Sequence, residues 1–140
     1  MPDPNCIFCK IVAGQIPCHK VFEDDDTLSF LDIGPLAEGH LLVIPKEHYG
    51  RLDEMPAELA GRVLAHLPRL SRAVSQATGA AGFNILQNND KVAQQEVPHV
   101  HFHIIPRAAG DGLGYRWIKS EPAATRVSAV KEKLESALKS

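Results

Sequence analysis

Alternation of polar and apolar positions is the clearest pattern in the chain, and it is strongest at residues 99–105, which read His-Val-His-Phe-His-Ile-Ile. Side chains of a β-strand point alternately to its two faces. The pattern therefore predicts a strand with His99, His101 and His103 in a row on one exposed face and apolar residues packed beneath. With seven histidines in 140 residues, a shuffled chain would contain such a triplet only about once in a hundred. The row therefore indicates a functional site.

Shorter patterns predict further strands around this one. Two short strands at 19–23 and 27–31 are joined by the acidic turn 24–26, whose carboxylates we expect to be solvated. The apolar run at 40–44 predicts a central strand that is covered on both faces. A strand at 83–86 leads through a polar loop into the histidine strand, and the two predict a hairpin whose loop lies near the histidines.

Helical spacing of apolar residues begins after Pro56 and predicts one long helix with a kink at Pro68. A second helical stretch is predicted at 122–138. The fold class is therefore α+β, an antiparallel sheet with one long helix and short helices. We expect a single domain over residues 1–140, with residues 108–140 as its tail.

Composition limits the classes of partner. A chain of 140 residues that is 44% hydrophobic is sufficient for one buried core. A formal net charge of −2 gives no long-range attraction to nucleic acid or to an anionic membrane, which favours a small substrate. No apolar run approaches the roughly 20 residues of a membrane span, and the N-terminus lacks the features of a signal peptide. We therefore expect a cytoplasmic protein.

The cysteines and histidines predict a metal site. Cys6 and Cys9 form a Cys-x-x-Cys pair, which can place two thiolates on one metal ion. A redox pair and simple burial of two small residues are the competing interpretations. His48 follows the central strand, and either end of the histidine row would complete a Cys2His2 set of ligands. Such a closed site is structural, whereas two adjacent histidines sharing one metal would resemble a zinc hydrolase.

A middle histidine that is free of metal is a candidate nucleophile. The imidazole of His101 is mostly neutral at pH 7, so its lone pair can attack phosphorus and form a covalent intermediate. His103 and the amide of Asn88 are candidate donors to the phosphate oxygens. Asp32 ends a strand, where its carboxylate can reach over the sheet or form a turn. The alternative is that the three histidines are hydrogen-bonded polar residues on a groove.

The histidine row resembles the His-φ-His-φ-His-φ-φ signature of the histidine triad (HIT) family of nucleotide hydrolases and transferases. The blocks at 6–11, 30–35 and 39–48 resemble other blocks of that family in the same order, and those of its zinc-containing bacterial-type branch in particular. The resemblance covers most of the chain as far as Arg107.

The resemblance implies an antiparallel sheet that continues across a homodimer, and a role for most of the candidate residues. His101 would take up the nucleotidyl group, with His103 and Asn88 near the phosphate. Asp32 would hold the ribose. One structural Zn²⁺ per chain would be bound by Cys6, Cys9, His48 and His99, and the base would be enclosed by Ile7, Phe8, Ile11, Phe30 and Ile33.

The implied activity is hydrolysis or transfer of a nucleotidyl group from an AMP conjugate such as a nucleoside phosphoramidate. The substrate would be a purine nucleotide conjugate, with AMP as product. A dinucleoside polyphosphate hydrolase and a nucleotide-binding module with little turnover remain alternatives.

The chain departs from the family at Gln94, where glycine is common, at Glu96, where the phosphoramidase branch has a hydroxyl, and at Pro98. A carboxylate at Glu96, which we place near the nucleotide, would repel phosphate.

Overall fold

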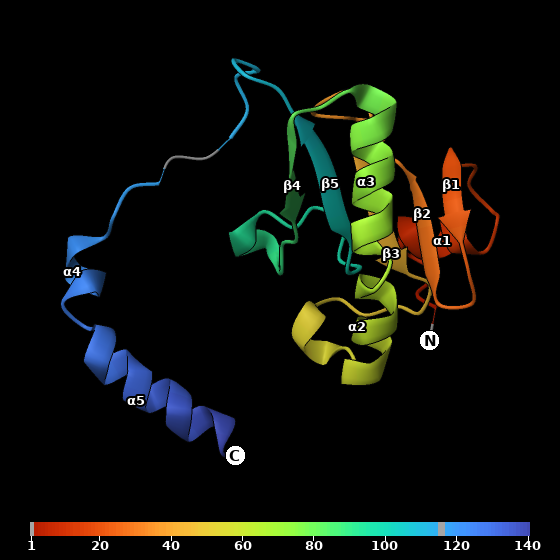
Figure 1. Ribbon diagram of the computed structural model, residues 1–140. Helices are drawn as coiled ribbons and strands as arrows, with labels where there is room; N and C mark the ends of the chain where they lie inside the picture. Colours follow the sequence, from red (N-terminus) through yellow and green to blue (C-terminus); the bar gives the residue numbers. More distant parts are fainter. Residues whose placement is uncertain (1, 115–116) are drawn as a thin grey trace.

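A five-stranded antiparallel sheet forms the body of the protein (Figure 1). The structure is a computed structural model that describes residues 2–114 and 117–140. In spatial order the strands are β1 (Lys20–Glu23), β2 (Thr27–Leu31), β3 (Leu41–Pro45), β5 (Phe102–Arg107) and β4 (Gly82–Leu86). The α+β class is confirmed, and so are the hairpin of β1 and β2, the central position of β3 and the pairing of β4 with β5.

The histidine strand is shorter than predicted, because β5 begins at Phe102 rather than at His99. Ahead of β5 the backbone is bonded to loops: the His99 amide donates to the Val97 carbonyl and the Val100 amide donates to the Tyr49 carbonyl, each at 2.8 Å. Pro98 has no amide hydrogen for a ladder. Only His103 of the three histidines therefore belongs to a paired strand.

The long helix predicted after Pro56 is two helices, α2 (Ala57–Leu64) and α3 (Leu67–Thr78). Pro68 lies in the first turn of α3, where a missing amide hydrogen costs no helical hydrogen bond. The break therefore falls just before the proline instead of forming a kink at it. The predicted stretch 122–138 is likewise divided into α4 (Glu121–Ala124) and α5 (Val127–Leu138). The remaining helices are α1 (Ile7–Val12), η1 (Leu52–Glu54) and η2 (Lys91–Ala93).

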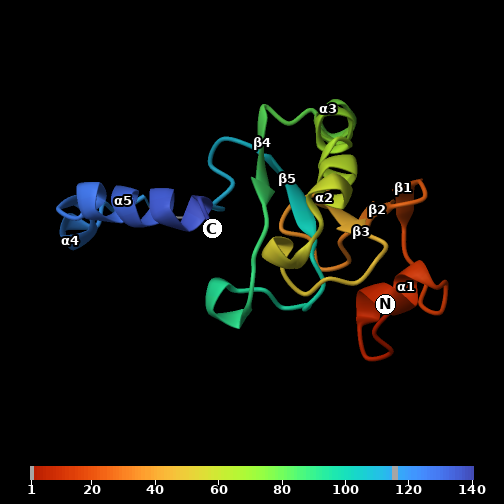
Figure 2. The same cartoon turned by 90° about the horizontal axis from the view of Figure 1, so that it is seen from below.

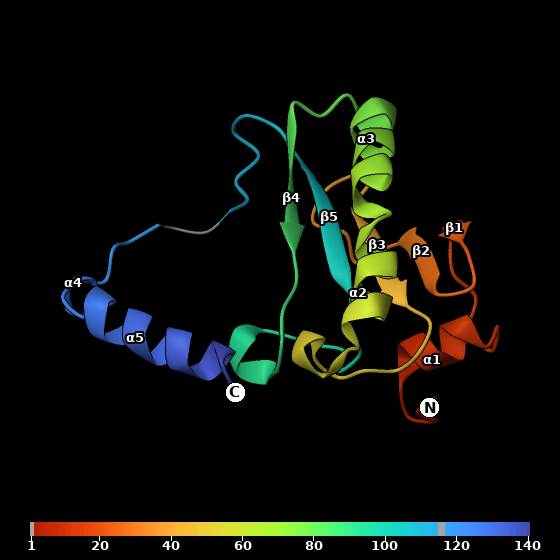
Figure 3. The ribbon, with the colours of Figure 1, turned by 60° about the horizontal axis from the view of Figure 1, so that its bottom comes forward.

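Each face of the sheet carries its own apolar core. Leu41, Val43 and Ile104 face α2 and α3, which cover that side in Figures 1 and 3. Leu42 and Ile44, which alternate with them on the central strand, pack with the residues of α1 on the other side. The two-sided burial explains why the β3 segment is apolar at every position.

The acidic turn between β1 and β2 contacts the helices through Asp24 and Asp26, whose side chains remain 39% and 32% exposed, so its carboxylates are partly solvated, as expected, and are also paired. Asp24 Oδ2 lies 2.7 Å from His66 Nε2, and Asp26 Oδ2 accepts a hydrogen bond from Arg62 Nε at 2.7 Å. These contacts join residues about 40 positions apart, which local sequence cannot indicate. The turn thereby fixes the edge of the sheet against α2 and α3.

The C-terminal part of the chain leaves the body after β5. Residues 117–140, with α4 and α5, lie away from the sheet and from α3 in both Figure 1 and Figure 2. None of the described helices is long and apolar enough to cross a membrane.

Two hydroxyls on β2 give a matched stability test. The Thr27 hydroxyl is buried, and it has no hydrogen-bond partner among the described residues. Thr27→Val keeps the shape and removes a desolvated polar atom, so we expect the free energy of unfolding to rise by about 1 kcal/mol. The Ser29 hydroxyl donates a hydrogen bond to the Leu42 carbonyl at 2.8 Å, so Ser29→Ala should lower the free energy of unfolding by about 1 kcal/mol. Urea denaturation measures both values, and a loss of stability in Thr27→Val would contradict the assignment.

Candidate functional site

Four side chains that could bind one metal ion come from three distant segments and meet at one end of the sheet. Cys6 precedes α1 and Cys9 lies within it, His48 follows β3, and His99 precedes β5. Their ligand atoms all lie within 4.8 Å of one another. These are the four residues that the resemblance implied, and the helical turn from Cys6 to Cys9 directs both sulfurs to one point.

The distances between these atoms fit a tetrahedral zinc site. His48 Nδ1 and His99 Nδ1 are 3.1 Å apart, and the sulfur–nitrogen distances are 3.3 Å from Cys9 to His48 and 3.4 Å from Cys6 to His99. Zinc bonded to nitrogen at about 2.0–2.1 Å and to sulfur at about 2.3 Å would place its ligand atoms roughly 3.3–3.8 Å apart. The donor set of two thiols and two imidazoles therefore has the chemistry that zinc requires, and these three distances lie within about 0.2 Å of the expected range.

His99 is fixed in the tautomer that a metal needs. Its Nε2 donates a hydrogen bond to the Pro45 carbonyl at 2.8 Å, which leaves the lone pair on Nδ1, the atom that faces the cysteines. Burial lowers the pKa of His99 to about 4, so the ring is neutral at pH 7. A backbone carbonyl that orients a histidine in this way is typical of metal sites.

The three histidines share one side of the chain, as predicted, but they do not form an exposed row. His99 and His101 are 0% and 6% exposed, and only His103 is partly open. Phe8 of α1 covers them, with its ring centroid 5.1 Å from that of His101 in an edge-on contact. The sequence showed the shared face correctly, but it did not show that α1 would pack over it.

His101 is oriented by the backbone of its neighbour in the triad. Its Nδ1 donates to the His99 carbonyl at 2.7 Å, so Nε2 carries the lone pair. Burial lowers the pKa of His101, and the ring is therefore neutral at pH 7. The ring forms part of the wall of the main pocket. A neutral, oriented imidazole of this kind is a suitable nucleophile.

A fourth histidine, His40, orients His103. The Leu36 amide donates to His40 Nδ1 at 3.0 Å, so the proton of neutral His40 is on Nε2, and Nε2 lies 2.9 Å from His103 Nδ1. His103 accepts there and carries its own proton on Nε2. Burial lowers the pKa of His103 to about 4 and also lowers that of His40. This series of hydrogen bonds, from the Leu36 amide through His40 to His103, leaves the Nε2–H group of a neutral His103 at the pocket.

His40 was missed by the sequence analysis, because it seemed to be only the first residue of an apolar strand. Leu42 of β3 lies opposite His103 of β5, and this register brings His40 beside the triad. The order of the strands is therefore the signal that identifies it. Asp32, His40 and His103 also lie close enough to hold a metal, but the Leu36 amide occupies one nitrogen of His40 and the proton is on the other.

The main pocket has a volume of about 550 Å³ and lies on the α1 side of the sheet. Every residue proposed from the sequence for catalysis or nucleotide binding contributes to its wall: Ile7, Phe8, Ile11, Phe30, Asp32, Ile33, Asn88, Glu96, His101 and His103. Cys18, Gln94 and Val97 also line it. The cavity that contains the two histidines is therefore also lined by these apolar side chains, of which Ile33 is 87% exposed.

Asp32 forms a turn and also lines the pocket. Asp32 Oδ1 accepts a hydrogen bond from the Gly34 amide at 2.8 Å, which forms the turn after β2. Asp32 Oδ2 lies 3.7 Å from His40 Nε2 and faces the pocket region. One oxygen therefore shapes the turn, and the other remains available to a ligand hydroxyl.

The loop between β4 and β5 lies beside the histidines, as the predicted hairpin required, and Asn88, Gln94 and Glu96 line the pocket. Gln95, which the sequence analysis did not single out, holds this loop in place. It is 6% exposed, accepts from the Asp90 amide at 2.7 Å and donates to the Gly50 carbonyl at 2.7 Å. Gln94 has φ of 71°, a value that explains why glycine suits that position.

Comparison with known proteins supports a family assignment. The HIT domain family model matches residues 13–110. An uncharacterised HIT-like protein of Methanocaldococcus jannaschii is 50% identical over 107 residues, covering 76% of this chain and 82% of its own. The adenosine 5'-monophosphoramidase hnt1 of Schizosaccharomyces pombe is 43% identical over 136 residues, covering 96% of this chain and 99% of its own.

Solved structures agree with the sequence matches. SMU.412c from Streptococcus mutans superposes with a TM-score of 0.91 at 44% identity, covering 97% of this chain and 87% of its own. A HIT family protein from Bacillus anthracis superposes with a TM-score of 0.88 at 38% identity, covering 96% of this chain and 97% of its own. A zinc-bound histidine triad family protein from Mycobacterium smegmatis superposes with a TM-score of 0.74 at 38% identity, covering 95% of this chain and 97% of its own. With the triad motif, its pocket and these matches together, the chain belongs to the histidine triad (HIT) family.

Proposed function

We propose that this protein is a nucleotide hydrolase that cleaves AMP conjugates, such as adenosine phosphoramidates, through a covalent nucleotidyl intermediate on His101. The observation that carries the proposal is the hydrogen bond from His101 Nδ1 to the His99 carbonyl, which leaves the Nε2 lone pair of a buried, neutral ring at the pocket. The adenosine 5'-monophosphoramidase of S. pombe, 43% identical over nearly the whole chain, supports the same chemistry.

In the first step, His101 Nε2 attacks the phosphorus of the conjugate, a P–N bond to the ring forms, and the bond to the leaving amine breaks. The amine departs with the electron pair of that bond and takes a proton from water. The positive charge of the adduct ring is stabilised by the hydrogen bond to the His99 carbonyl. In the second step, water attacks phosphorus, releases AMP and restores His101.

The other pocket residues supply binding. The N–H group that His40 orients on His103 donates to a phosphoryl oxygen, where negative charge develops during attack. Asn88 donates nearby. The free oxygen of Asp32 accepts from the ribose hydroxyls, and the base lies among the apolar side chains of the same wall: Ile7, Phe8, Ile11, Phe30 and Ile33.

We also propose one zinc ion per chain, held by Cys6, Cys9, His48 and His99. Four protein ligands leave no open coordination position, so the ion would supply structure rather than Lewis acid chemistry. It would join α1, the end of β3 and the segment before β5. Since His99 orients His101 through its carbonyl, the ligands also set the position of the nucleophile. The zinc-bound relative from M. smegmatis supports this site.

The charge of the pocket argues against the second candidate, a dinucleoside polyphosphate hydrolase. Among the described residues that line the pocket, Asp32 and Glu96 are the charged ones, and no lysine or arginine accompanies them. The histidines have lowered pKa values and are neutral. A polyphosphate chain would bring several negative charges to this wall, whereas a phosphoramidate brings one.

We propose a homodimer in which two sheets join through β4. This strand is at the edge of the sheet, where it pairs only with β5, and its unpaired groups can accept a second strand. Phe83 and Ile85 on β4 are each 43% exposed, which fits a surface that a second copy covers.

We place the protein in the cytoplasm. This fits Cys6, Cys9 and Cys18, none of which forms a disulfide.

The nucleophile is tested with His101→Ala. We expect turnover of an adenosine phosphoramidate to fall at least about 10³-fold, because no other group can form the adduct. A rapid quench followed by mass spectrometry should detect an AMP adduct on the wild-type protein only. His19→Ala, at an exposed histidine outside the pocket, is the matched control. Normal turnover by His101→Ala would overturn the mechanism, and tight AMP binding without turnover by the wild type would favour a binding module.

Elemental analysis tests the zinc. We expect about one zinc per chain in protein purified without chelators, and less than about a tenth of that in Cys9→Ala, which removes one of four ligands. Cys18→Ser should keep the zinc, since Cys18 lies outside the cluster. Equal zinc content in Cys9→Ala and Cys18→Ser would refute the assignment of the ligands.

Glu96 should make the enzyme sensitive to the charge of the leaving group. With AMP amides whose amines have equal length but carry a cation, no charge or an anion, we expect kcat/KM to decrease in that order. Glu96→Gln should reduce the cation-to-anion ratio about threefold to fivefold, the size typical of a partly screened ion pair. Glu58→Gln, at an exposed position on α2, is the control. A ratio that Glu96→Gln leaves unchanged would refute the role of this carboxylate.

A further inference from the structure

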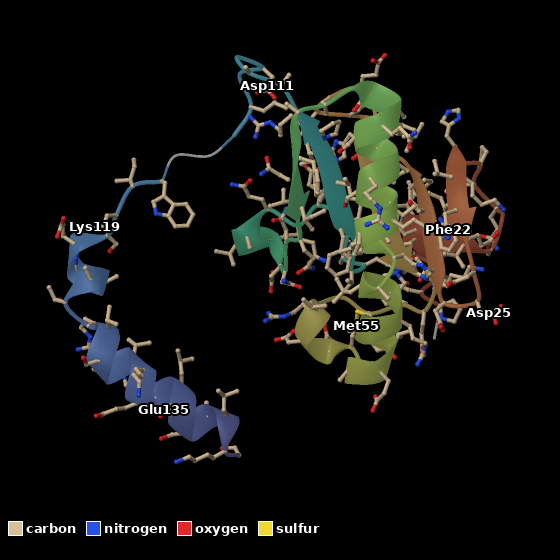
Figure 4. All side chains as sticks on the ribbon, in the orientation of Figure 1. Phe22, Asp25, Met55, Asp111, Lys119 and Glu135 are labelled. Carbon is tan, nitrogen blue, oxygen red and sulfur yellow. The ribbon has the colours of Figure 1, made fainter. Side chains whose placement is uncertain are left out.

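The C-terminal arm, residues 117–140, lies outside the folded body. In Figures 1, 2 and 3 it runs past the free edge of β4, on the side away from β5. Figure 4 places the labelled side chains of Lys119 and Glu135 on this arm, well away from Phe22 and Met55 on the body. The proposed chemistry does not use any residue of the arm.

The main helix of the arm, α5, is amphipathic. Val127, Val130, Leu134 and Leu138 recur at helical spacing on one side, and they are 65%, 43%, 59% and 85% exposed. The remaining positions carry mostly charged, small or polar residues, and Lys131 forms an ion pair with Glu135 at 2.6 Å. An apolar stripe of this kind is typical of a helix that packs against a protein surface.

A helix of 12 residues is marginal in water unless such a face is buried. The position of the arm is nevertheless shared with solved relatives. The arm comprises 24 of the 140 residues, about one sixth of the chain. The superposition on SMU.412c has a TM-score of 0.91, which could not be reached if the arm pointed elsewhere in that structure, even if every other residue coincided. The B. anthracis structure, at 0.88 over 96% of this chain, leads to the same conclusion. A short helix held away from its own body is the arrangement expected of a segment that packs on a partner outside its own chain.

A second copy of this chain is the partner that fits the position. The chain leaves the sheet at Arg107, the end of β5, which is the neighbour of β4, and the arm lies beyond the β4 edge. A copy that paired with this edge would lie between the body and the arm. It would cover the exposed Phe83 and Ile85 and present its own surface to α5.

We propose that residues 117–140 form an intersubunit arm, and that the apolar stripe of α5 packs on a second copy of the chain. The arm of each subunit would then pack against the other subunit, in addition to any pairing of the two β4 strands. This proposal rests on the homodimer of the proposed function. It adds that the arm, rather than the β4 edge alone, stabilises that dimer.

The test compares the full-length protein with two variants. Val130→Lys/Leu134→Lys places two charges on the stripe, and Ser136→Lys places one on the opposite side of the same helix. Lysine has good helix propensity, and α5 lies outside both cores, so each variant should fold. Sedimentation over a dilution series gives the dimer dissociation constant. Hydrogen exchange of the α5 amides shows whether the helix is covered.

We expect a wild-type dimer whose α5 amides exchange at least about tenfold more slowly than unprotected amides. The stripe variant should raise the dissociation constant at least about tenfold and remove the protection, whereas Ser136→Lys should change neither by more than about twofold. A dimer with unprotected α5 amides that the stripe variant leaves unchanged would overturn the arm but keep the dimer. A monomeric wild type would overturn both, and hydrolysis of the AMP amide reports separately on the catalytic proposal.

Discussion

The hydrogen bond from His101 Nδ1 to the His99 carbonyl, at 2.7 Å, connects the two chemical parts of this protein. On one side, His99 donates to the Pro45 carbonyl and faces Cys6 and Cys9. On the other side, the same bond fixes which nitrogen of His101 carries the lone pair. A change that displaced His99 would therefore rotate the proposed nucleophile as well as disturb the cysteine and histidine cluster.

Burial gives the site its electrostatic character. The pKa values of His40, His101 and His103 are all lowered, and desolvation is the largest cause in each case. The rings are therefore neutral at pH 7, and they present oriented lone pairs and N–H groups to the pocket rather than charge. With Asp32 and Glu96 as the charged side chains of the described wall, the pocket suits a phosphate that carries one negative charge better than a polyphosphate.

The alternation of residues 99–105 was sufficient to predict that the three histidines share one side of the chain, with Val100, Phe102 and Ile104 buried on the other. The apolar run of β3 likewise predicted a central strand, because covered strands leave a continuous pattern. Helix boundaries were less accurate: periodicity indicated the faces of α2 and α3 but not the break before Pro68. The motif resemblance gave the four candidate metal ligands and the pocket residues that the structure brings together.

The sequence by itself determined the fold class, the shared side of the triad and the set of residues with chemical potential, since these follow from local periodicity and short motifs. Only the tertiary structure decided that α1 buries the histidines, that His40 orients His103, and that Asp24 binds His66. Each of these depends on contacts between segments far apart in the chain. Such contacts leave no periodic signal, because they are set by the order of the strands and by the packing of helices across the sheet.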